Sequence, residues 1–205
     1  MGILVDTAYG ARNLHALEPA VTGFLRRVLK KDDRVFLVGF DTSSDLVVDF
    51  TNDAGALAKG MLGLRGGSGA MLYDAVFYAC WDKLRAFPQG EFERALVIVS
   101  DGQDAQSRVA PRQALEIAQR IQVRLFSIAT PGTIRNPAVL RLAEQTGGLN
   151  ASSFEAIAEE FEHQYLLLYQ PKPFAPDGGV HEVNIKPHRS ELSVRAPKGY
   201  YAPSP

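Results

Sequence analysis

Two aspartates stand where this chain could do chemistry. Asp6 directly follows the apolar run at residues 3–5 (ILV), and Asp101 directly follows the longer run at residues 94–100 (RALVIVS). Both runs are typical of buried β-strands, and an open parallel sheet binds ligands at the carboxyl ends of its strands. Aspartate also caps turns in many proteins, so each residue taken alone favours a structural role. Together they could form one acidic rim.

A glycine-rich turn could bring a third group to this rim. Residues 66–70 (GGSGA) nearly match the nucleophile-elbow pattern Gly-x-Ser-x-Gly, with alanine in the last place. The match leaves open a remote alternative, a serine hydrolase in which Ser68 is the nucleophile and Asp101 precedes the histidine. An elbow needs a strong strand immediately before its serine, and residues 61–65 have little strand character. The histidines that follow in the required order are His163, His181 and His188.

Other classes of chemistry find little support in the composition. The formal net charge is -1, with 22 basic and 23 acidic residues, so the basic excess of a nucleic-acid-binding protein is missing. The glycine-rich turn lacks the Gly-Lys-Ser/Thr of a phosphate-binding loop, and the four histidines have no zinc-ligand spacing. No apolar run approaches the ~18–20 residues of a membrane span. The single cysteine, Cys80, excludes an intrachain disulfide and is predicted to be a core residue.

Strand and helix signals alternate around these residues. Short apolar runs separated by amphipathic stretches predict a parallel sheet with helices on both faces, an α/β doubly wound, Rossmann-like fold. The predicted strands are residues 3–5, 34–40, 46–50, 94–100 and 123–129, the second and third close enough for a hairpin. The predicted helices are one that starts near Pro19, those at residues 53–61, 70–85, 111–121 and 154–162, and one from Asn136 to Gly147.

The end of the chain has a different pattern. Three apolar segments at residues 165–169, 180–185 and 192–195 are divided by turn residues, with no helical stretch between them. We therefore expect an α/β domain over residues 1–170 and a short antiparallel β extension over residues 171–205, packed on or beside it. An unpaired edge strand invites another chain, so a structural or assembly role, with self-association through these C-terminal strands, is an alternative function.

Three short motifs occur in a fixed order: residues 6–10 (DTAYG), 66–74 (GGSGAMLYD) and 97–104 (VIVSDGQD). In this order and spacing they resemble the von Willebrand factor A family, and the resemblance runs from residue 3 to about residue 169. The ending VRAPKGYYAP is similar to a bacterial subgroup described as VWFA-related in acidobacteria. The resemblance implies a protein-binding, adhesion-type module rather than an enzyme, and an exported, extracytoplasmic protein. A strand at the first residues suggests a domain excised from a longer chain.

The family builds a metal-ion-dependent adhesion site from two aspartates, two serines and a threonine. Asp6 and Asp101 match the aspartates, but the serines fall on Ala8 and Gly10 and the threonine falls on Ala70. Mg²⁺ prefers about six oxygens in an octahedral array, so two carboxylates would hold it largely through water. We expect a degenerate site that binds Mg²⁺ or Mn²⁺ weakly or not at all, and no other cofactor.

Three neighbours bear on how the two carboxylates are supported. Thr7 and Ser68 carry the hydroxyl groups nearest to the two carboxylates. Thr7 should point to the opposite side of the strand end, and Ser68 lies two residues before Ala70, the position that matches the family's threonine. Two carboxylates without a cation repel each other, which raises the pKa of one of them. Arg12 could relieve that repulsion by pairing with one carboxylate.

What remains is a rim of loop residues on a rigid scaffold, where binding commonly takes place. Tyrosine is frequent at interface hot spots, although Tyr9 could equally pack on its own domain. We expect the rim to bind a protein partner of unknown identity without a metal ion, and a purely structural domain is the open alternative. The expected rim residues are Asp6, Tyr9, Gly10, Ser68, Gly69, Asp101, Gln103 and Asp104.

Overall fold

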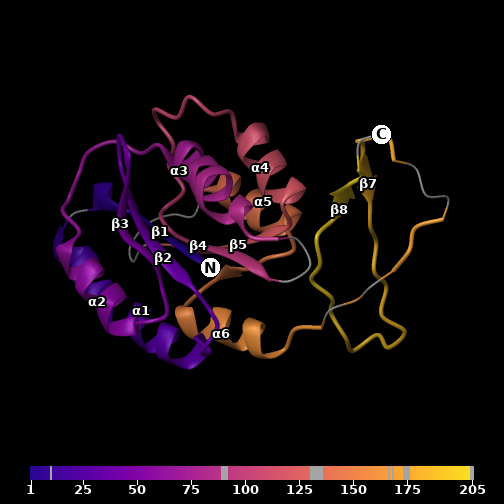
Figure 1. Ribbon diagram of the computed structural model, residues 1–205, viewed down its shortest axis with the longest axis horizontal. Coiled ribbons are helices and arrows are strands. Elements are labelled where there is room, and N and C mark those ends of the chain that lie inside the picture. Colours follow the sequence, from indigo (N-terminus) through magenta and orange to yellow (C-terminus); the bar gives the residue numbers. More distant parts are fainter. Residues whose placement is uncertain are drawn as a thin grey trace.

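A six-stranded sheet forms the centre of the computed structural model, which describes residues 1–9, 11–88, 92–129, 136–165, 167, 169–172 and 176–203. The strand order is β3-β2-β1-β4-β5-β6, and only the β2–β3 hairpin is antiparallel (Figure 1). This arrangement confirms the predicted mostly parallel sheet and its hairpin. The strands are β1 (Gly2–Asp6), β2 (Val35–Phe40), β3 (Ser44–Thr51), β4 (Arg94–Val99), β5 (Val123–Ile128) and β6 (Asn150–Ala151).

Helices cover both faces of the sheet, as predicted (Figure 1). Side chains alternate along each strand, so Ile3 and Val5 pack under α1, α2 and α6 while Leu4 packs under α3, α4 and α5. Each face therefore has its own hydrophobic core. The helices are α1 (Ala11–Val28), α2 (Ala54–Gly63), α3 (Leu72–Tyr78), α4 (Pro111–Arg120), α5 (Pro137–Gln145) and α6 (Phe154–Glu162).

The first helix starts earlier than its proline suggests. α1 begins at Ala11, and Pro19 lies inside it, so the expected start near Pro19 is wrong. Leu14 and Leu17 precede the proline and are both buried against the sheet. A proline inside a helix costs about 3 kcal/mol, and burying a leucine contributes about 1.5–3 kcal/mol, so two leucines offset it.

The helix expected over residues 70–85 starts two residues late and changes type. The backbone oxygen of Ala70 accepts hydrogen bonds from the backbone N–H groups of Ala105 (3.0 Å) and Gln106 (3.2 Å), which ties Ala70 to a loop instead of the helix. After α3, the chain continues as one π-helical turn over Ala79–Lys83 and a 3₁₀ turn. Cys80 in the π turn is fully buried, and burial raises the pKa of its thiol to about 12. The predicted core role of Cys80 is therefore confirmed.

The C-terminal extension contains one antiparallel pair, β7 (Val180–Glu182) with β8 (Gly199–Tyr201). The strand expected at residues 192–195 is wrong, and no strand occurs at the described residues of 165–169. The chain instead lies against the α/β body at this point. A Cβ atom on Gly147 would lie 2.3 Å from the backbone nitrogen of Pro197, and the N–H of Lys198 donates to the backbone oxygen of Gln145 at 3.4 Å.

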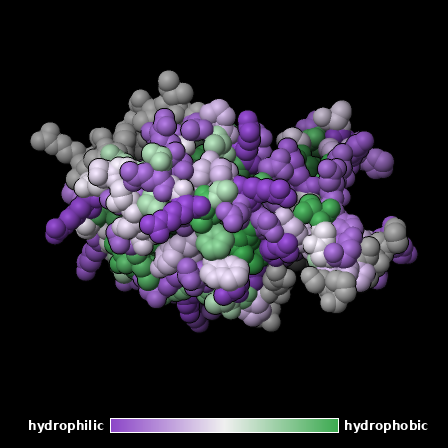
Figure 2. Space-filling model, turned by 90° about the horizontal axis from the view of Figure 1, so that it is seen from above, coloured by the Kyte–Doolittle hydropathy of each residue, from purple (hydrophilic) through white to green (hydrophobic). Residues whose placement is uncertain are grey.

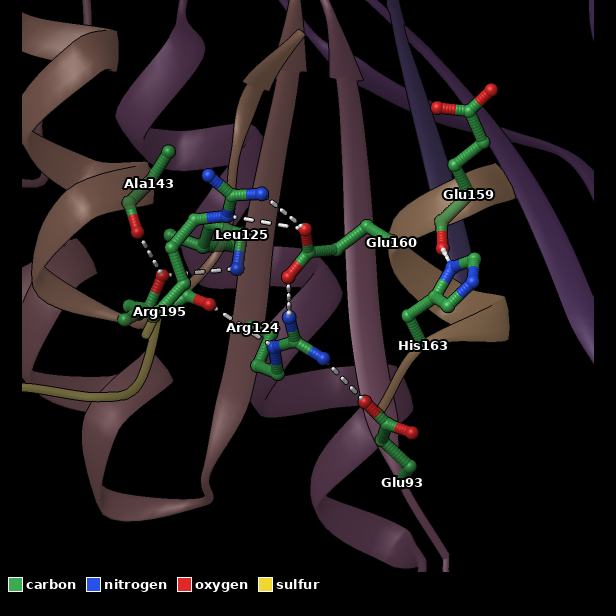
Figure 3. A network of polar contacts seen from close by, with 10 residues as sticks. Glu93, Arg124, Leu125, Ala143, Glu159, Glu160, His163 and Arg195 are labelled. Carbon is green, nitrogen blue, oxygen red and sulfur yellow. Dashed lines mark hydrogen bonds and ion pairs between the residues drawn. The ribbon is translucent and has the colours of Figure 1, made fainter. Parts of the chain in front are cut away.

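Charged side chains tie the extension to the body (Figure 3). Arg124 in β5 donates to Glu93 at 3.0 Å and to Glu160 in α6 at 3.1 Å. Glu160 also accepts from Arg195 of the extension at 2.7 Å. The side chains of Arg124 and Glu160 are each 16% exposed, so solvent screens their attraction less than that of a surface pair. This chain of ion pairs fixes residue 195 against α6.

Candidate binding site at the carboxyl end of the sheet

The first and fourth strands end side by side. β1 and β4 are parallel neighbours in which Val5 lies opposite Val99, so Asp6 and Asp101 emerge at the same edge of the sheet. Both line one open hollow of about 350 Å³, to which the glycine-rich turn also contributes. The structure thus brings the two strand ends and the turn together. The lining residues are Asp6, Ala8, Gly69, Ala70, Asp101, Gln103 and Ala105.

Asp6 is held in place from both of its carboxylate oxygens. Oδ1 accepts a hydrogen bond from the N–H of Ala8 at 3.0 Å, and Oδ2 accepts one from the hydroxyl of Ser100 at 2.8 Å. Burial raises the pKa of Asp6 and the nearby charge of Asp101 adds to the rise, while the two hydrogen bonds offset part of it. The predicted rise in the pKa of one carboxylate is therefore present at Asp6, but burial contributes more to it than the charge of Asp101 does.

Sequence reasoning missed two residues at this edge. Ser100 is buried and bridges the strands, because its hydroxyl donates to Asp6 and accepts from the N–H of Gly102 at 2.9 Å. Asp41 directly follows β2 and acts electrostatically on Asp6. A Cβ on Gly67 would lie 1.7 Å from an oxygen of Asp41, so the glycine-rich turn rests on this carboxylate. Asp41 gave the same signal as Asp6, a carboxylate directly after an apolar strand.

Only some of the expected rim residues face the hollow. Gly69 lines the hollow with a φ of +84°, and there is no room for a Cβ atom on it beside Thr42. Gln103 also lines the hollow, and its N–H donates to Asp101 Oδ1 at 2.8 Å. Ser68 is exposed and lies outside the lining. The hydroxyl of Thr7, at 3.1 Å from the backbone oxygen of Phe40, donates to β2. Gly10 and the side chains of Tyr9 and Arg12 lie outside the described residues.

Asp104 and Asp74 bind the loop after β4 to the start of α3. Asp104 Oδ1 accepts from the hydroxyl of Ser107 at 2.5 Å and from the N–H of Tyr73 at 3.4 Å. Asp74 Oδ1 accepts from the N–H of Val109 at 2.7 Å. These bonds hold the loop that carries Gln103 and Ala105 against α3. Asp104 therefore positions the rim instead of lining it.

The hollow presents few oxygens to a metal ion. Ala8 and Ala70 line it with methyl groups, and both oxygens of Asp6 already accept hydrogen bonds. Two carboxylates fall well short of the about six oxygens that Mg²⁺ prefers. Within the described ranges, no group of three or more His, Cys, Asp or Glu residues is arranged to hold a metal. The donors present do not fit the divalent-metal site that the resemblance implies.

The serine-hydrolase alternative lacks its elbow. α2 ends at Gly63, and the fully described residues 64–67 before Ser68 form no strand. The ring of His163 lies 2.8 Å from the backbone oxygen of Glu159, and that of His181 lies 3.0 Å from Asp177 (His163 in Figure 3). Ser68 therefore does not have the strand-to-helix turn that presents a nucleophile.

Solved structures share this fold. One is an aerotolerance-related membrane protein from Bacteroides fragilis, with a TM-score of 0.63, 16% identity, and coverage of 80% of this chain and 98% of that chain. A von Willebrand factor type A protein from Catenulispora acidiphila has a TM-score of 0.61 at 13% identity, covering 78% of this chain and 40% of that one. Proximal thread matrix protein 1 from the mussel byssus, with a zinc-occupied MIDAS motif, has a TM-score of 0.60 at 11% identity, covering 78% and 45%. No protein-family model and no curated protein sequence matches the chain.

Proposed function

We propose that this chain, whose fold is that of the von Willebrand factor A domain, is a non-catalytic protein-binding module that works without a bound metal ion. The observation that supports this most is the hollow itself. Carboxylates from two adjacent strands converge there, and its other walls are mainly alanine and glycine. Such a site on loops of a rigid scaffold suits recognition, and its described lining residues include no nucleophile beside a base.

The metal-free part of the proposal rests on the side chains at the rim. Ala8 and Ala70 stand where metal-binding members of the family have hydroxyl groups, and Ser100 uses its hydroxyl on Asp6. A Mg²⁺ ion here would keep most of its water, so we expect millimolar affinity at best. An exported location is part of the same proposal. It is supported by the sequence resemblance and by the description of the similar Bacteroides protein as a membrane protein; among the described ranges, no helix has the length and apolar character to span a bilayer.

Photo-crosslinking tests the proposal directly. A benzoylphenylalanine at Gln103, which lines the hollow, should give discrete adducts in cells of the source organism, and one at the exposed Lys59 on α2 should not. The adducts should survive a chelator and disappear when Ala105→Trp fills the hollow. Equal adducts at both positions, or loss of the Gln103 adduct with chelator, would contradict the proposal.

A specific observation also favours the assembly role as a second candidate. Among the residues that the structure describes, eleven large hydrophobic side chains are exposed, and seven of them belong to the segment after α6. Green side chains interrupt the polar surface of the extension in Figure 2. A two-stranded sheet is only marginally stable by itself, and exposed strand edges can form hydrogen bonds with a strand of another chain. The seven residues are Tyr165, Leu167, Tyr169, Val180, Ile185, Leu192 and Val194.

If the extension mediates assembly, sedimentation equilibrium will show a concentration-dependent dimer. Val180→Lys in β7 should weaken it at least about tenfold, because a lysine on an edge strand opposes pairing. Leu62→Lys is the matched control, since Leu62 is 51% exposed but lies in α2, whereas Val180 is 55% exposed. A monomer at every concentration would rule this role out.

A further inference from the structure

The hollow carries negative charge that the rest of the described chain does not neutralise. Asp6 and Asp101 line it, and Asp41 acts on Asp6 from the next strand. The ion pairs among the described residues involve other carboxylates, and none reaches these three. The donors do not fit a divalent metal, as shown above. The site is therefore acidic, lacks the oxygen donors of a divalent-metal site, and suits a cation of another kind.

From these observations we infer that the hollow takes the lysine side chain of a partner protein, whose ammonium group lies between Asp6 and Asp101. The inference rests on the proposed function and names the group that the rim recognises.

The shape of the hollow fits a lysine. Its volume of about 350 Å³ is at the lower end of the roughly 300–1,000 Å³ of small-ligand pockets, so it has room for one lysine side chain. The methyl groups of Ala8, Ala70 and Ala105 can cover the four methylenes of the stem. Lysine commonly packs its stem on apolar surface while its charged end reaches polar groups.

The hydrogen bonding favours lysine over arginine. An arginine fork donates two parallel hydrogen bonds to the two oxygens of one carboxylate, so it needs an open lone pair in the carboxylate plane on each oxygen. Both oxygens of Asp6 already accept hydrogen bonds, and Asp101 Oδ1 accepts one from the N–H of Gln103. An ammonium group has three donors that point in different directions, so it can reach one remaining lone pair on each aspartate.

The test uses n-butylammonium chloride, the side-chain analogue of lysine, as the probe and amide NMR spectra as the readout. In the unmodified chain, the amide signals of Ala8, Gly69 and Ala105 should shift saturably. n-Butanol, which has the same stem without the charge, should leave them unchanged. Asp101→Asn should weaken binding at least about fivefold, whereas Asp45→Asn, which changes an exposed acid on β3, should not. Ala105→Lys provides a second variant, because its tethered ammonium should compete with the probe.

Several outcomes would overturn the inference. One is the absence of a saturable shift, and another is an equal affinity in Asp101→Asn. Binding of the probe only in Arg12→Gln would mean that the chain's own guanidinium fills the hollow. Displacement of the probe by submillimolar MgCl₂ would establish a metal site and would overturn the metal-free proposed function as well. If the Gln103 crosslink persists while the probe fails to bind, the proposed function stands and only the lysine inference falls.

Discussion

Replacing Ala8 with serine and Ala70 with threonine is expected to raise the affinity for Mn²⁺ and Mg²⁺ by at least about a hundredfold, or about 2.8 kcal/mol. Both residues line the hollow beside Asp6 and Asp101, so each new hydroxyl adds an oxygen within the same small space. Divalent ions of this kind gain affinity with each oxygen that replaces a bound water in the right geometry. Calorimetric titration of the unmodified chain and of the double variant measures the difference.

The control variants separate a rebuilt site from a general effect of added hydroxyls. Adding Asp101→Asn to the double variant should remove the gain, because the site then loses one of the two carboxylates that line the hollow. Ala105→Ser adds a hydroxyl to the same hollow at a position outside the motif and should bring little gain. Micromolar binding by the unmodified chain would contradict the metal-free proposal, since it would mean that other oxygens complete the shell.

The two halves of the double variant differ in structural risk. Ala8 is exposed, so a serine there costs little. Ala70 is 6% exposed and its backbone oxygen holds the loop at Ala105 and Gln106, so the extra methyl of threonine has less space. Ala70→Ser supplies the hydroxyl without that methyl. If the serine version binds metal and the threonine version does not, steric strain at Ala70 is the cause.

The α/β body could be predicted because its signals are local. Runs such as residues 95–99 (ALVIV) are apolar throughout, as is typical of parallel strands covered on both faces. Helix starts were equally clear where a side chain caps them, as when Asn136 accepts from the N–H of Ala138 at 2.9 Å just before Pro137. The start of α1 was misplaced because burial of Leu14 and Leu17, a tertiary effect, outweighs the local signal of Pro19.

The candidate site was predictable only in outline. Asp6 and Asp101 follow apolar strands, and that position predicted a shared edge. The bond between Ser100 and Asp6 joins residues 94 apart, and it depends on β1 and β4 being neighbours with a register that places their ends together. No local pattern carries that register. The inward turn of Asp104 toward Tyr73 likewise depends on how the loop packs on α3.

The extension was the least predictable part because contacts with the body shape it. Residues 192–195 alternate like a strand, yet Arg195 pairs with Glu160, and Pro197 packs against Gly147. Beyond them, the N–H of Val183 donates to the backbone oxygen of Lys198 at 2.9 Å and begins the pairing of β7 with β8. The anchored segment therefore sets where the small sheet forms.

That anchor leads to the largest expected loss of stability. Glu160→Ala should lower the free energy of unfolding by about 2 kcal/mol, below the 3–5 kcal/mol of a fully buried pair because both side chains keep some solvent contact. Arg124 would lose one of its two carboxylate partners in a largely buried position, and Arg195 would lose the partner that holds the extension. Urea unfolding followed by circular dichroism measures the stability, and hydrogen exchange at the Val183 amide reports release of the extension.

Glu159→Ala is the matched control. Glu159 is the preceding residue of α6, its side chain is exposed, and the bond from His163 goes to its backbone oxygen, which the substitution keeps (Figure 3). The control should change stability by less than about 0.5 kcal/mol and leave exchange at Val183 unaltered. Equal losses in both variants would show that α6 itself weakens and that the ion pairs do not anchor the extension. Faster exchange in Glu160→Ala alone would mean that the position of the β7–β8 sheet, and any assembly through it, depends on this one carboxylate.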